Sequence, residues 1–385
     1  MKDQFLLTPD ITFLNHGSFG ACPKVVFENY RYWQLEFEKE PVYFIQKRLN
    51  DLLRHSRQML GDFVGCEAND LFFTPNPSTA INTVMRSMKL EPGDEILSTN
   101  LEYGAMDRMW NFYCRKNGTR YVQQPIELPL TSKEHFLEQF WKGYSERTKV
   151  VFISHITSST ALILPVQEIV EKARSLGLIT IVDGAHVPGH IDLNITALDC
   201  DYYTGAVHKW LLSPKGCSFL YARKEVQDGL DPLIVSWGYD SDFPGESRFI
   251  DYHEYNGTRD FSPYLTVPEL FEFREANNWV EQTAASKALI REWYPKFCEL
   301  LNTQPICPVT EEFLGQMCSI PVNTPDEFKL KDTLYDRFGI QIPVTKHGDK
   351  NWIRLSLQPY NTIDDIQTFY QALQQLKEEG ELLIT

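Results

Sequence analysis

Two residues near the middle of the chain, Asp183 and Lys209, have types and positions that suit catalysis. Asp183 ends the apolar run ITIVD, and a carboxylate at the carboxyl end of a buried strand lies where α/β sheets bind ligands. Lys209 lies among apolar and aromatic residues in VHKWLL, although lysine is rarely buried. Each residue also has a structural interpretation, as a helix cap for Asp183 and as a surface lysine with a packed stem for Lys209.

The pair is more specific than either residue alone. Asp183 and Lys209 are 26 positions apart (209 − 183), and each follows one of two successive predicted strands. Burial lowers the pKa of a lysine and makes its amine a nucleophile that can form a Schiff base. A carboxylate paired with a pyridine nitrogen keeps such a cofactor ring an acceptor of electrons. The two residues therefore predict a site for pyridoxal 5'-phosphate (PLP).

Two sequence blocks around this pair resemble a known family. DGAHVPGH (183–190) and GAVHKWLLSPKG (205–216) together resemble the fold-type I PLP-dependent enzymes of the class V aminotransferase family. Within it, the chain is most similar to the isopenicillin N epimerase-like branch, from FLNHGSFG (13–20) to IRLSLQPYNT (353–362). The resemblance implies PLP as the cofactor and a small amino acid as the substrate. It also implies an α/β fold with a large, mostly parallel, doubly wound sheet and a smaller α+β C-terminal domain.

The resemblance implies roles for four residues of these blocks. Lys209 matches the Schiff-base lysine, and Asp183 matches the partner of the pyridine nitrogen. His186 matches the histidine beside that aspartate, near the cofactor ring, and completes the expected catalytic set. His208 matches a residue that usually contacts the cofactor phosphate. As isolated residues, loop histidines such as His186 could equally be satisfied by neighbouring protein groups.

The loop TPNPSTAIN (74–82) matches the phosphate cradle of the family. Ser78 and Thr79 open a predicted helix, whose N-terminal N–H groups can bind an anion. The family more often has a small residue where Pro77 stands, and proline removes one backbone donor. The alternative interpretation of Ser78 and Thr79 is ordinary helix capping.

Further cofactor contacts are implied on both sides of the ring. Tyr103 matches an aromatic residue that stacks on the ring, although an aromatic residue there could also pack in the core. Ser158, beside Thr157, matches a position that hydrogen-bonds the ring hydroxyl, and a serine-rich turn is the alternative. Gly257 and Thr258 match a segment that reaches the cofactor phosphate of the other subunit, which implies a homodimer. A surface turn at Asn-Gly is the structural alternative.

Three residues are expected to bind the substrate. Arg354 matches the arginine that clamps the substrate α-carboxylate, for which its planar fork is suited. An exposed arginine on an edge strand is the alternative. Asn15 and His16 lie in the N-terminal loop that lines the substrate entrance in the resemblance, whereas a glycine-rich surface loop would need no function.

The expected chemistry is removal of a proton from the substrate α-carbon with Lys209 as the general base. Return of the proton to the opposite face gives epimerisation, which the resemblance favours. Loss of a β-substituent (a C–S lyase) and transamination are the alternatives. A non-catalytic binding protein on the same scaffold is an alternative of another class. An epimerase needs an acid on each face, and Tyr103, His186 or His347 could supply the second.

A persulfide-forming desulfurase is disfavoured because residues 319–353 contain no cysteine, and Cys318 fits a buried structural role. The eight cysteines form no CxxC pair, so we expect no metal site and a reducing cytoplasmic location. The N-terminus does not resemble a signal peptide. Lys and Arg number 37 against 52 Asp and Glu, a net charge of −15, which disfavours nucleic acid and anionic membranes as partners.

The elements that must position these residues follow from hydrophobic patterning. PVQEIVEKARSLG (165–177) predicts a helix between two strands and thus a βαβ unit. Helices are predicted at 24–60, 267–280, 283–301, 325–338 and 363–379. We expect an N-terminal segment (1–22) at the site entrance, a large cofactor domain (23–262) and a small domain (263–385). Strands are predicted at 95–99, 119–124, 149–155, 179–183, 202–204, 217–222, 317–322 and 352–357.

Overall fold

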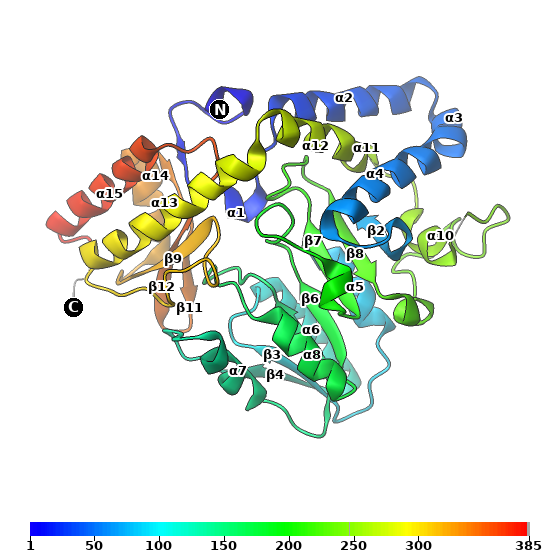
Figure 1. The fold of residues 1–385 in the computed structure, drawn as a ribbon, viewed down its shortest axis with the longest axis horizontal. Coiled ribbons are helices and arrows are strands. Elements are labelled where there is room, and N and C mark those ends of the chain that lie inside the picture. Colours follow the sequence, from blue (N-terminus) through cyan, green and yellow to red (C-terminus); the bar gives the residue numbers. More distant parts are fainter. Residues whose placement is uncertain (246, 383–385) are drawn as a thin grey trace.

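A seven-stranded sheet forms the centre of the protein in the computed structural model, which describes residues 1–245 and 247–382. Its neighbouring strands are parallel except for β8, which is antiparallel to both of its neighbours. This arrangement confirms the predicted doubly wound α/β fold (Figure 1). In spatial order the strands are β2 (Leu71–Thr74), β8 (Ser218–Ala222), β7 (Tyr202–Ala206), β6 (Ile179–Asp183), β5 (Thr148–Ser154), β3 (Glu95–Thr99) and β4 (Arg120–Gln124).

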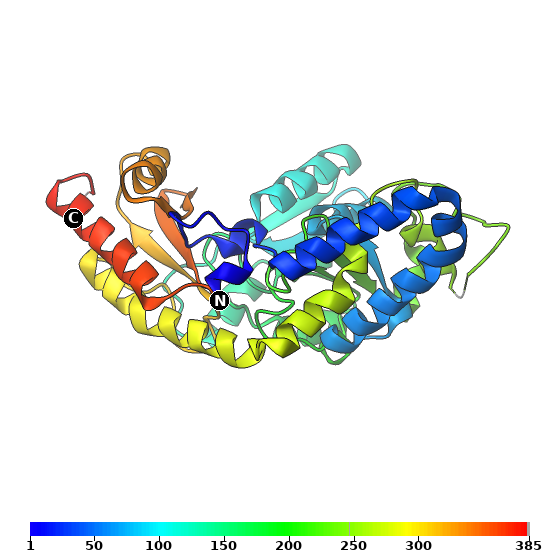
Figure 2. The same cartoon turned by 90° about the horizontal axis from the view of Figure 1, so that it is seen from above.

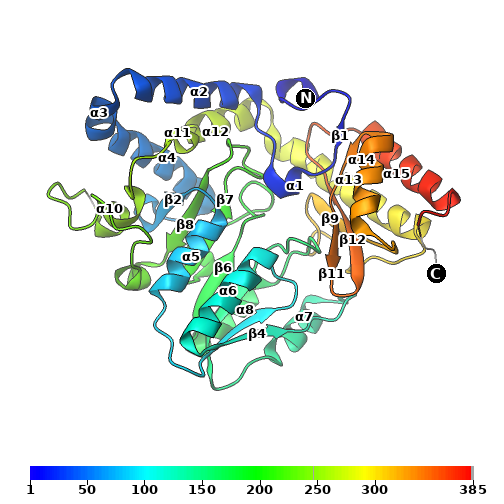
Figure 3. The ribbon, with the colours of Figure 1, turned by 180° about the vertical axis from the view of Figure 1, so that it is seen from behind.

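Helices cover both faces of this sheet. Helices α5 (Pro77–Ser87) and α6 (Gly104–Asn117) lie on one face, and α8 (Val166–Ser175) lies on the other (Figures 1 and 3). Successive strand residues point to opposite faces. Ile181 therefore packs in the core under α5 and α6, whereas Val182 packs in the core under α8. Burial on both faces explains why β5 and β6 are nearly continuous apolar runs.

All six central strands predicted from such runs are present, with ends shifted by one or two residues at most. The seventh strand, β2, is not predicted by the sequence analysis. It has only four residues and pairs with β8, which lies about 150 positions later in the chain. Its pairing is long-range, so no local pattern identifies it.

The C-terminal part of the chain contains a second, antiparallel sheet in the order β11–β12–β9. The long helix α13 runs from the centre of the molecule along this sheet (Figure 2). The strands are β9 (Met317–Val322), β11 (Val344–His347) and β12 (Lys350–Ser356). The helices are α12 (Val267–Ala276), α13 (Trp279–Leu300), α14 (Glu327–Phe338) and α15 (Ile363–Glu378).

The N-terminal segment lies between the two sheets (Figure 2). Its strand β1 (Thr12–Phe13) pairs in parallel with β10 (Ile340–Gln341), and Asn15 forms a bridge with Ser356 of β12. The predicted division at residues 22 and 262 stays a prediction. The other helices are α1 (His16–Phe19), α2 (Lys24–Lys39), α3 (Pro41–Tyr43), α4 (Leu49–Val64), α7 (Lys133–Trp141), α9 (Ile195–Leu198), α10 (Arg248–Glu254) and α11 (Ser262–Leu265). None of the helices in the described ranges is long and apolar enough to cross a membrane.

Gly20 brings this N-terminal segment against the loop that carries Lys209. Its φ of 70° is in the left-handed region, and a Cβ atom there would lie 2.1 Å from the carbonyl oxygen of His208. Gly177 has the same φ of 70°, but no atom lies within 4 Å of the position its Cβ would take. An alanine at either position would have the same backbone strain, but only at Gly20 would its Cβ also clash with neighbouring atoms.

Gly20→Ala is expected to lower the free energy of unfolding by about 2–4 kcal/mol, because left-handed strain and a backbone clash add together. The matched control Gly177→Ala should cost about 1 kcal/mol, from strain alone. Urea unfolding of both variants measures the difference. Equal losses would show that the N-terminal segment does not press on the Lys209 loop.

Candidate active site

Asp183 and Lys209 meet at the carboxyl edge of the central sheet. Asp183 is the last residue of β6, and Lys209 lies in the turn between β7 and β8. Asp183 is buried and only 4 % exposed, and Lys209 is partly buried. Burial raises the pKa of Asp183, while its hydrogen bond from the Ala185 N–H (2.9 Å) and the charge of Lys209 lower it. The structure therefore brings together the two residues on which the sequence prediction depends.

The amine of Lys209 is poised to lose its proton near neutral pH. Burial and the positive charge of Arg354 lower its pKa to about 7, although the charge of Asp183 opposes the shift. A buried ammonium is costly because it has lost its hydration, so the neutral amine is favoured. A neutral amine is the form that attacks a carbonyl carbon.

The hydrogen bonds of His186 indicate the same charge state. The indole Nε1–H of Trp210 can only donate, so His186 Nδ1 accepts from it (3.4 Å). The remaining proton of a neutral His186 is then on Nε2, which lies 3.2 Å from Lys209 Nζ. That pair is satisfied when Nε2–H donates to the lone pair of a neutral amine. Burial also lowers the pKa of His186 well below its usual value, which keeps the ring neutral.

Arg354 extends from β12 of the second sheet into the same site. It is 5 % exposed, and its charge lowers the pKa values of both Lys209 and His186. Its Nη1 donates to the Ser158 carbonyl (2.7 Å), and its Nη2 donates to Ser18 Oγ (2.7 Å). The Nε–H is buried, and none of the residues that the structure describes accepts from it. A guanidinium that keeps an unused donor in a site with a buried lysine is suited to an anionic ligand.

The N-terminal loop supports this site in a way that the sequence did not predict. Ser18, which the prediction omits, accepts from Arg354 and donates to Asn15 Oδ1. Asn15 thus acts on Arg354 through Ser18. The motif FLNHGSFG was the available signal, but it does not say which of its polar residues contacts Arg354.

The expectation that His16 lines the substrate entrance is not met. The ring is fully buried, its Nε2 lies 2.9 Å from the Lys209 carbonyl oxygen and 2.8 Å from the Gln358 amide nitrogen, and its Nδ1 lies 2.9 Å from the Tyr360 hydroxyl. Burial lowers its pKa to about 3, so the ring is neutral. Both ring nitrogens therefore contact protein groups, and His16 connects the N-terminal segment with the backbone carbonyl of Lys209.

The first turn of α5 has the form expected of an anion cradle. Helix α5 starts at the carboxyl end of β2, which is the edge of the sheet that also carries Asp183. Asn76 is its N-cap and accepts from the Thr79 N–H (2.8 Å), while Pro77 supplies no donor. Ser78 and the end of the helix dipole are left for an anion. The cap Asn76 was not predicted, although Asn-Pro before a helix is a capping signal.

His208 lies beside Lys209 and is 9 % exposed. Its Nδ1–H donates to the Cys217 carbonyl (2.8 Å), and burial lowers its pKa to about 4. Its Nε2 consequently carries no proton in the neutral ring and donates to a phosphate only after the ring gains one. The predicted phosphate contact stays a prediction.

Tyr103 and Ser158 flank Arg354 from two other loops. Tyr103 is the N-cap residue of α6, is 48 % exposed and interacts electrostatically with Arg354. Ser158 holds Arg354 through its carbonyl and its Oγ (3.3 Å). The neighbouring Thr157 is fully buried, and its Oγ1 accepts from the Leu162 N–H (2.9 Å). Of the two predicted alternatives at this turn, only Ser158 contacts a site residue.

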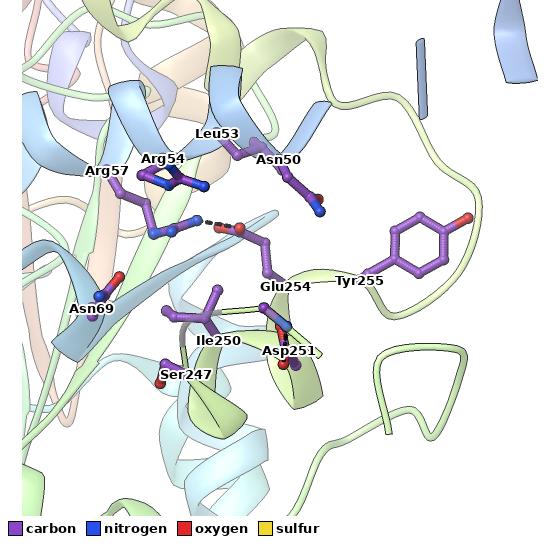
Figure 4. Close-up of a pocket in the computed structure, with 11 residues that line it drawn as sticks. Asn50, Leu53, Arg54, Arg57, Asn69, Ser247, Ile250, Asp251, Glu254 and Tyr255 are labelled. Carbon is purple, nitrogen blue, oxygen red and sulfur yellow. Dashed lines mark hydrogen bonds and ion pairs between the residues drawn. The ribbon is translucent and has the colours of Figure 1, made fainter. Parts of the chain in front are cut away.

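Gly257 and Thr258 lie in a turn that lines a separate cavity of about 420 Å³, together with Thr79. The turn follows helix α10, whose end is fixed by an ion pair between Glu254 and Arg57 of α4 (Figure 4). Arg57 and Glu254 are both buried and face each other across the small pocket between the two helices (Figure 4). Within one chain, Gly257 and Thr258 share this cavity with Thr79, and their predicted contact with the cofactor phosphate of the other subunit stays a prediction.

The residues present fit PLP. A partly buried lysine of lowered pKa, a buried carboxylate and a helix start, all at the same edge of the sheet, match the aldehyde, the pyridine nitrogen and the phosphate. Lys209, Asp183 and the start of α5 would hold the group. When bound, it supplies a ring that accepts the electron pair left by a bond broken at the substrate α-carbon.

The fold and the site define the class of a fold-type I PLP-dependent enzyme. Comparison with known proteins agrees, because the aminotransferase class-V family matches residues 21–369. The chain belongs to this family, and PLP is its cofactor.

Individual relatives differ in activity. The chain is 33 % identical to isopenicillin N epimerase of Amycolatopsis lactamdurans, over 98 % of each sequence. It is 27 % identical to a probable chloroplastic L-cysteine desulfhydrase of Arabidopsis thaliana, over 97 % of this chain and 84 % of the relative. An apo cysteine desulfurase of Thermococcus onnurineus NA1 has a similar fold, with a TM-score of 0.84, 20 % identity and coverage of 98 % and 97 %.

The rate at which the apoprotein takes up PLP should rise as the pH increases through about 7 and then level off. The neutral amine attacks the aldehyde, and Lys209 is neutral above its pKa of about 7. Stopped-flow absorbance of cofactor binding measures the profile. Arg354→Ala should move the midpoint upward, because it removes a charge that disfavours the ammonium. A rate that continues to rise toward pH 10 would mean that Lys209 is hydrated like a surface lysine.

Proposed function

We propose that this enzyme inverts the α-carbon of an amino-acid substrate, as an isopenicillin N epimerase-like enzyme. The observation that carries the proposal is the pKa of Lys209, which is lowered to about 7 in a site that also contains Asp183 and Arg354. Arg354 binds the substrate carboxylate, which directs the α-carbon toward Lys209. Lys209 Nζ then removes the α-proton as the general base.

Inversion requires a second proton donor on the opposite face, and Tyr103 is the better of the described candidates. His186 contacts Lys209 Nζ directly and so lies beside the first base. Tyr103 comes from a different loop, is half exposed and lies near Arg354. The side chain of His347, the third candidate, lies outside the described part of the structure.

A C–S lyase is the second candidate, because the chain is also similar to plant L-cysteine desulfhydrases. Such a reaction needs only Lys209 as base and a β-substituent that leaves. A desulfurase with a cysteine nucleophile is disfavoured, since Cys318 is fully buried in β9 and burial raises the pKa of its thiol well above the usual value. A thiol of that kind is not a nucleophile. Transamination remains the third alternative in the family.

The proposal includes a homodimer in which Gly257 and Thr258 reach the partner's cofactor phosphate. Support comes from the segment before α10, where several large apolar side chains are exposed to solvent. Such a surface is typical of a protein interface. The exposed residues are Ile234, Val235, Trp237, Tyr239 and Phe243. Light scattering at micromolar concentration tests the dimer.

Incubation of the holoenzyme in D₂O with isopenicillin N, L-cysteine and a panel of other L-amino acids separates the reactions. Epimerisation predicts one deuterium at the α-carbon and product of both configurations, measured by NMR and chiral chromatography. Tyr103→Phe should still exchange the α-proton but should form at least about tenfold less of the inverted product. Pyruvate with sulfide would support the lyase, and keto acid formed only with an amino acceptor would support transamination. Either result would contradict the epimerase proposal.

Arg354→Ala should raise the KM for the substrate about 100-fold, because a buried, charge-assisted carboxylate contact is lost. The absorbance of the lysine-bound cofactor should persist, since Lys209 and Asp183 are unchanged. Arg354→Lys should recover only part of the affinity, because it restores the charge but not the fork. As a control, Arg337→Ala on the surface of α14 should behave as wild type. An unchanged KM in Arg354→Ala would remove the carboxylate-clamp assignment.

A further inference from the structure

A second buried carboxylate, Glu102, lies close to Asp183 and has no role in the proposed chemistry. Glu102 is 2 % exposed and directly precedes Tyr103 in the loop after β3. Its Oε1 accepts from Thr99 Oγ1 (2.8 Å). Its Oε2 accepts from the Ser154 N–H (3.0 Å) and from Ser154 Oγ (2.5 Å). These three donors would satisfy the ionised form of the carboxyl group.

Ser154 connects this carboxylate with the strand of Asp183. Ser154 is the last residue of β5, and its register partner on β6 is Asp183. Neighbouring strands lie about 4.8 Å apart. Glu102, Ser154 and Asp183 therefore form a row across the carboxyl edge of the sheet, with a negative group at each end.

A buried carboxylate at the other end of β3, Glu95, serves as a structural comparison for Glu102. Glu95 is also 2 % exposed, but it forms ion pairs with Arg120 (2.9 Å) and Arg147 (2.9 Å). Within the described ranges, no lysine or arginine forms an ion pair with Glu102. A buried carboxylate without a compensating positive charge is expensive, so Glu102 is ionised only when a positive group lies near it. The pyridine nitrogen that Asp183 would hold could supply such a charge when it is protonated.

We propose that Glu102 is a positioning residue for the cofactor ring: its negative charge, placed behind Asp183 through Ser154, strengthens the hold of the pyridine nitrogen on its proton. The proposal rests on the assignment of Asp183 as the partner of that nitrogen. A protonated ring accepts electrons better, so Glu102 acts on the rate of α-proton removal without touching the substrate.

The surroundings of Glu102 support an electrostatic role. Burial raises its pKa to about 8, and the charges of Asp183 on β6 and Asp107 on α6 add to the shift, whereas the donors Ser154 and Thr99 oppose it. On β4, the Tyr121 hydroxyl faces the same region and donates to Asp107 (2.9 Å). A carboxyl with this pKa keeps its proton at pH 7, and a positive ring nitrogen on Asp183 would lower the pKa and favour the ionised form of Glu102.

The test uses holoenzyme reconstituted with PLP labelled with ¹⁵N at the pyridine nitrogen, whose NMR shift reports protonation. In Glu102→Gln the nitrogen should hold its proton about tenfold more weakly, so its titration midpoint moves to lower pH. Thr99→Val removes one donor from Glu102 and so disfavours its charge. It should move the midpoint in the same direction by less. The matched control Glu95→Gln should lower the melting temperature but leave the ¹⁵N titration unchanged.

An unchanged ¹⁵N titration in both Glu102→Gln and Thr99→Val would overturn the proposal and leave Glu102 a structural residue. Asp183→Asn separates this failure from failure of the Asp183 assignment. If Asp183 holds the nitrogen, Asp183→Asn abolishes its protonation whatever Glu102 does. If Asp183→Asn has no effect, the assignment itself is wrong, and the proposal for Glu102 falls with it.

Discussion

The chemistry of the site depends on the desolvation of the Lys209 amine. The pKa of Lys209 is lowered to about 7 because its ammonium loses hydration on burial and lies near the positive charge of Arg354. The protein contacts the backbone of this loop from two sides: His16 Nε2 lies 2.9 Å from the Lys209 carbonyl oxygen, and Gly20 packs against the carbonyl of His208. Trp210 closes the base of the site, stacked on His190 with ring centres 4.1 Å apart. A reactive amine is thus produced by packing of residues that never meet the substrate.

Electrostatics inside the site oppose those of the whole chain. The net charge is −15, yet the site contains two cationic groups, the partly buried Lys209 and the buried Arg354, and the charges of both lower the pKa of His186. The histidines around them are neutral, because burial lowers the pKa values of His16, His186 and His190. The histidines therefore supply no acidic proton at neutral pH. In the proposed reaction the protons are exchanged by Lys209 and by Tyr103 on the opposite face.

The sequence predicted the α/β fold and the chemical pair because both depend on local patterns. Apolar runs mark β5 and β6, and polar residues follow where such strands end. Contacts that join distant segments were not predictable. Arg354 and Ser158 are 196 positions apart, so nothing local shows that one holds the other. The depth of His16 likewise follows from packing against Trp210 and Tyr360, which a loop motif does not encode.

Chemical trapping of the cofactor on its lysine tests the central claim most directly. The holoenzyme is reduced with borohydride, digested with a protease and mapped by mass spectrometry. The account predicts the pyridoxyl label on Lys209 alone. Lys215 is the internal competitor, since it lies in the same loop and burial also lowers its pKa. A label on Lys215 or on another lysine, with Lys209 unmodified, would contradict the account.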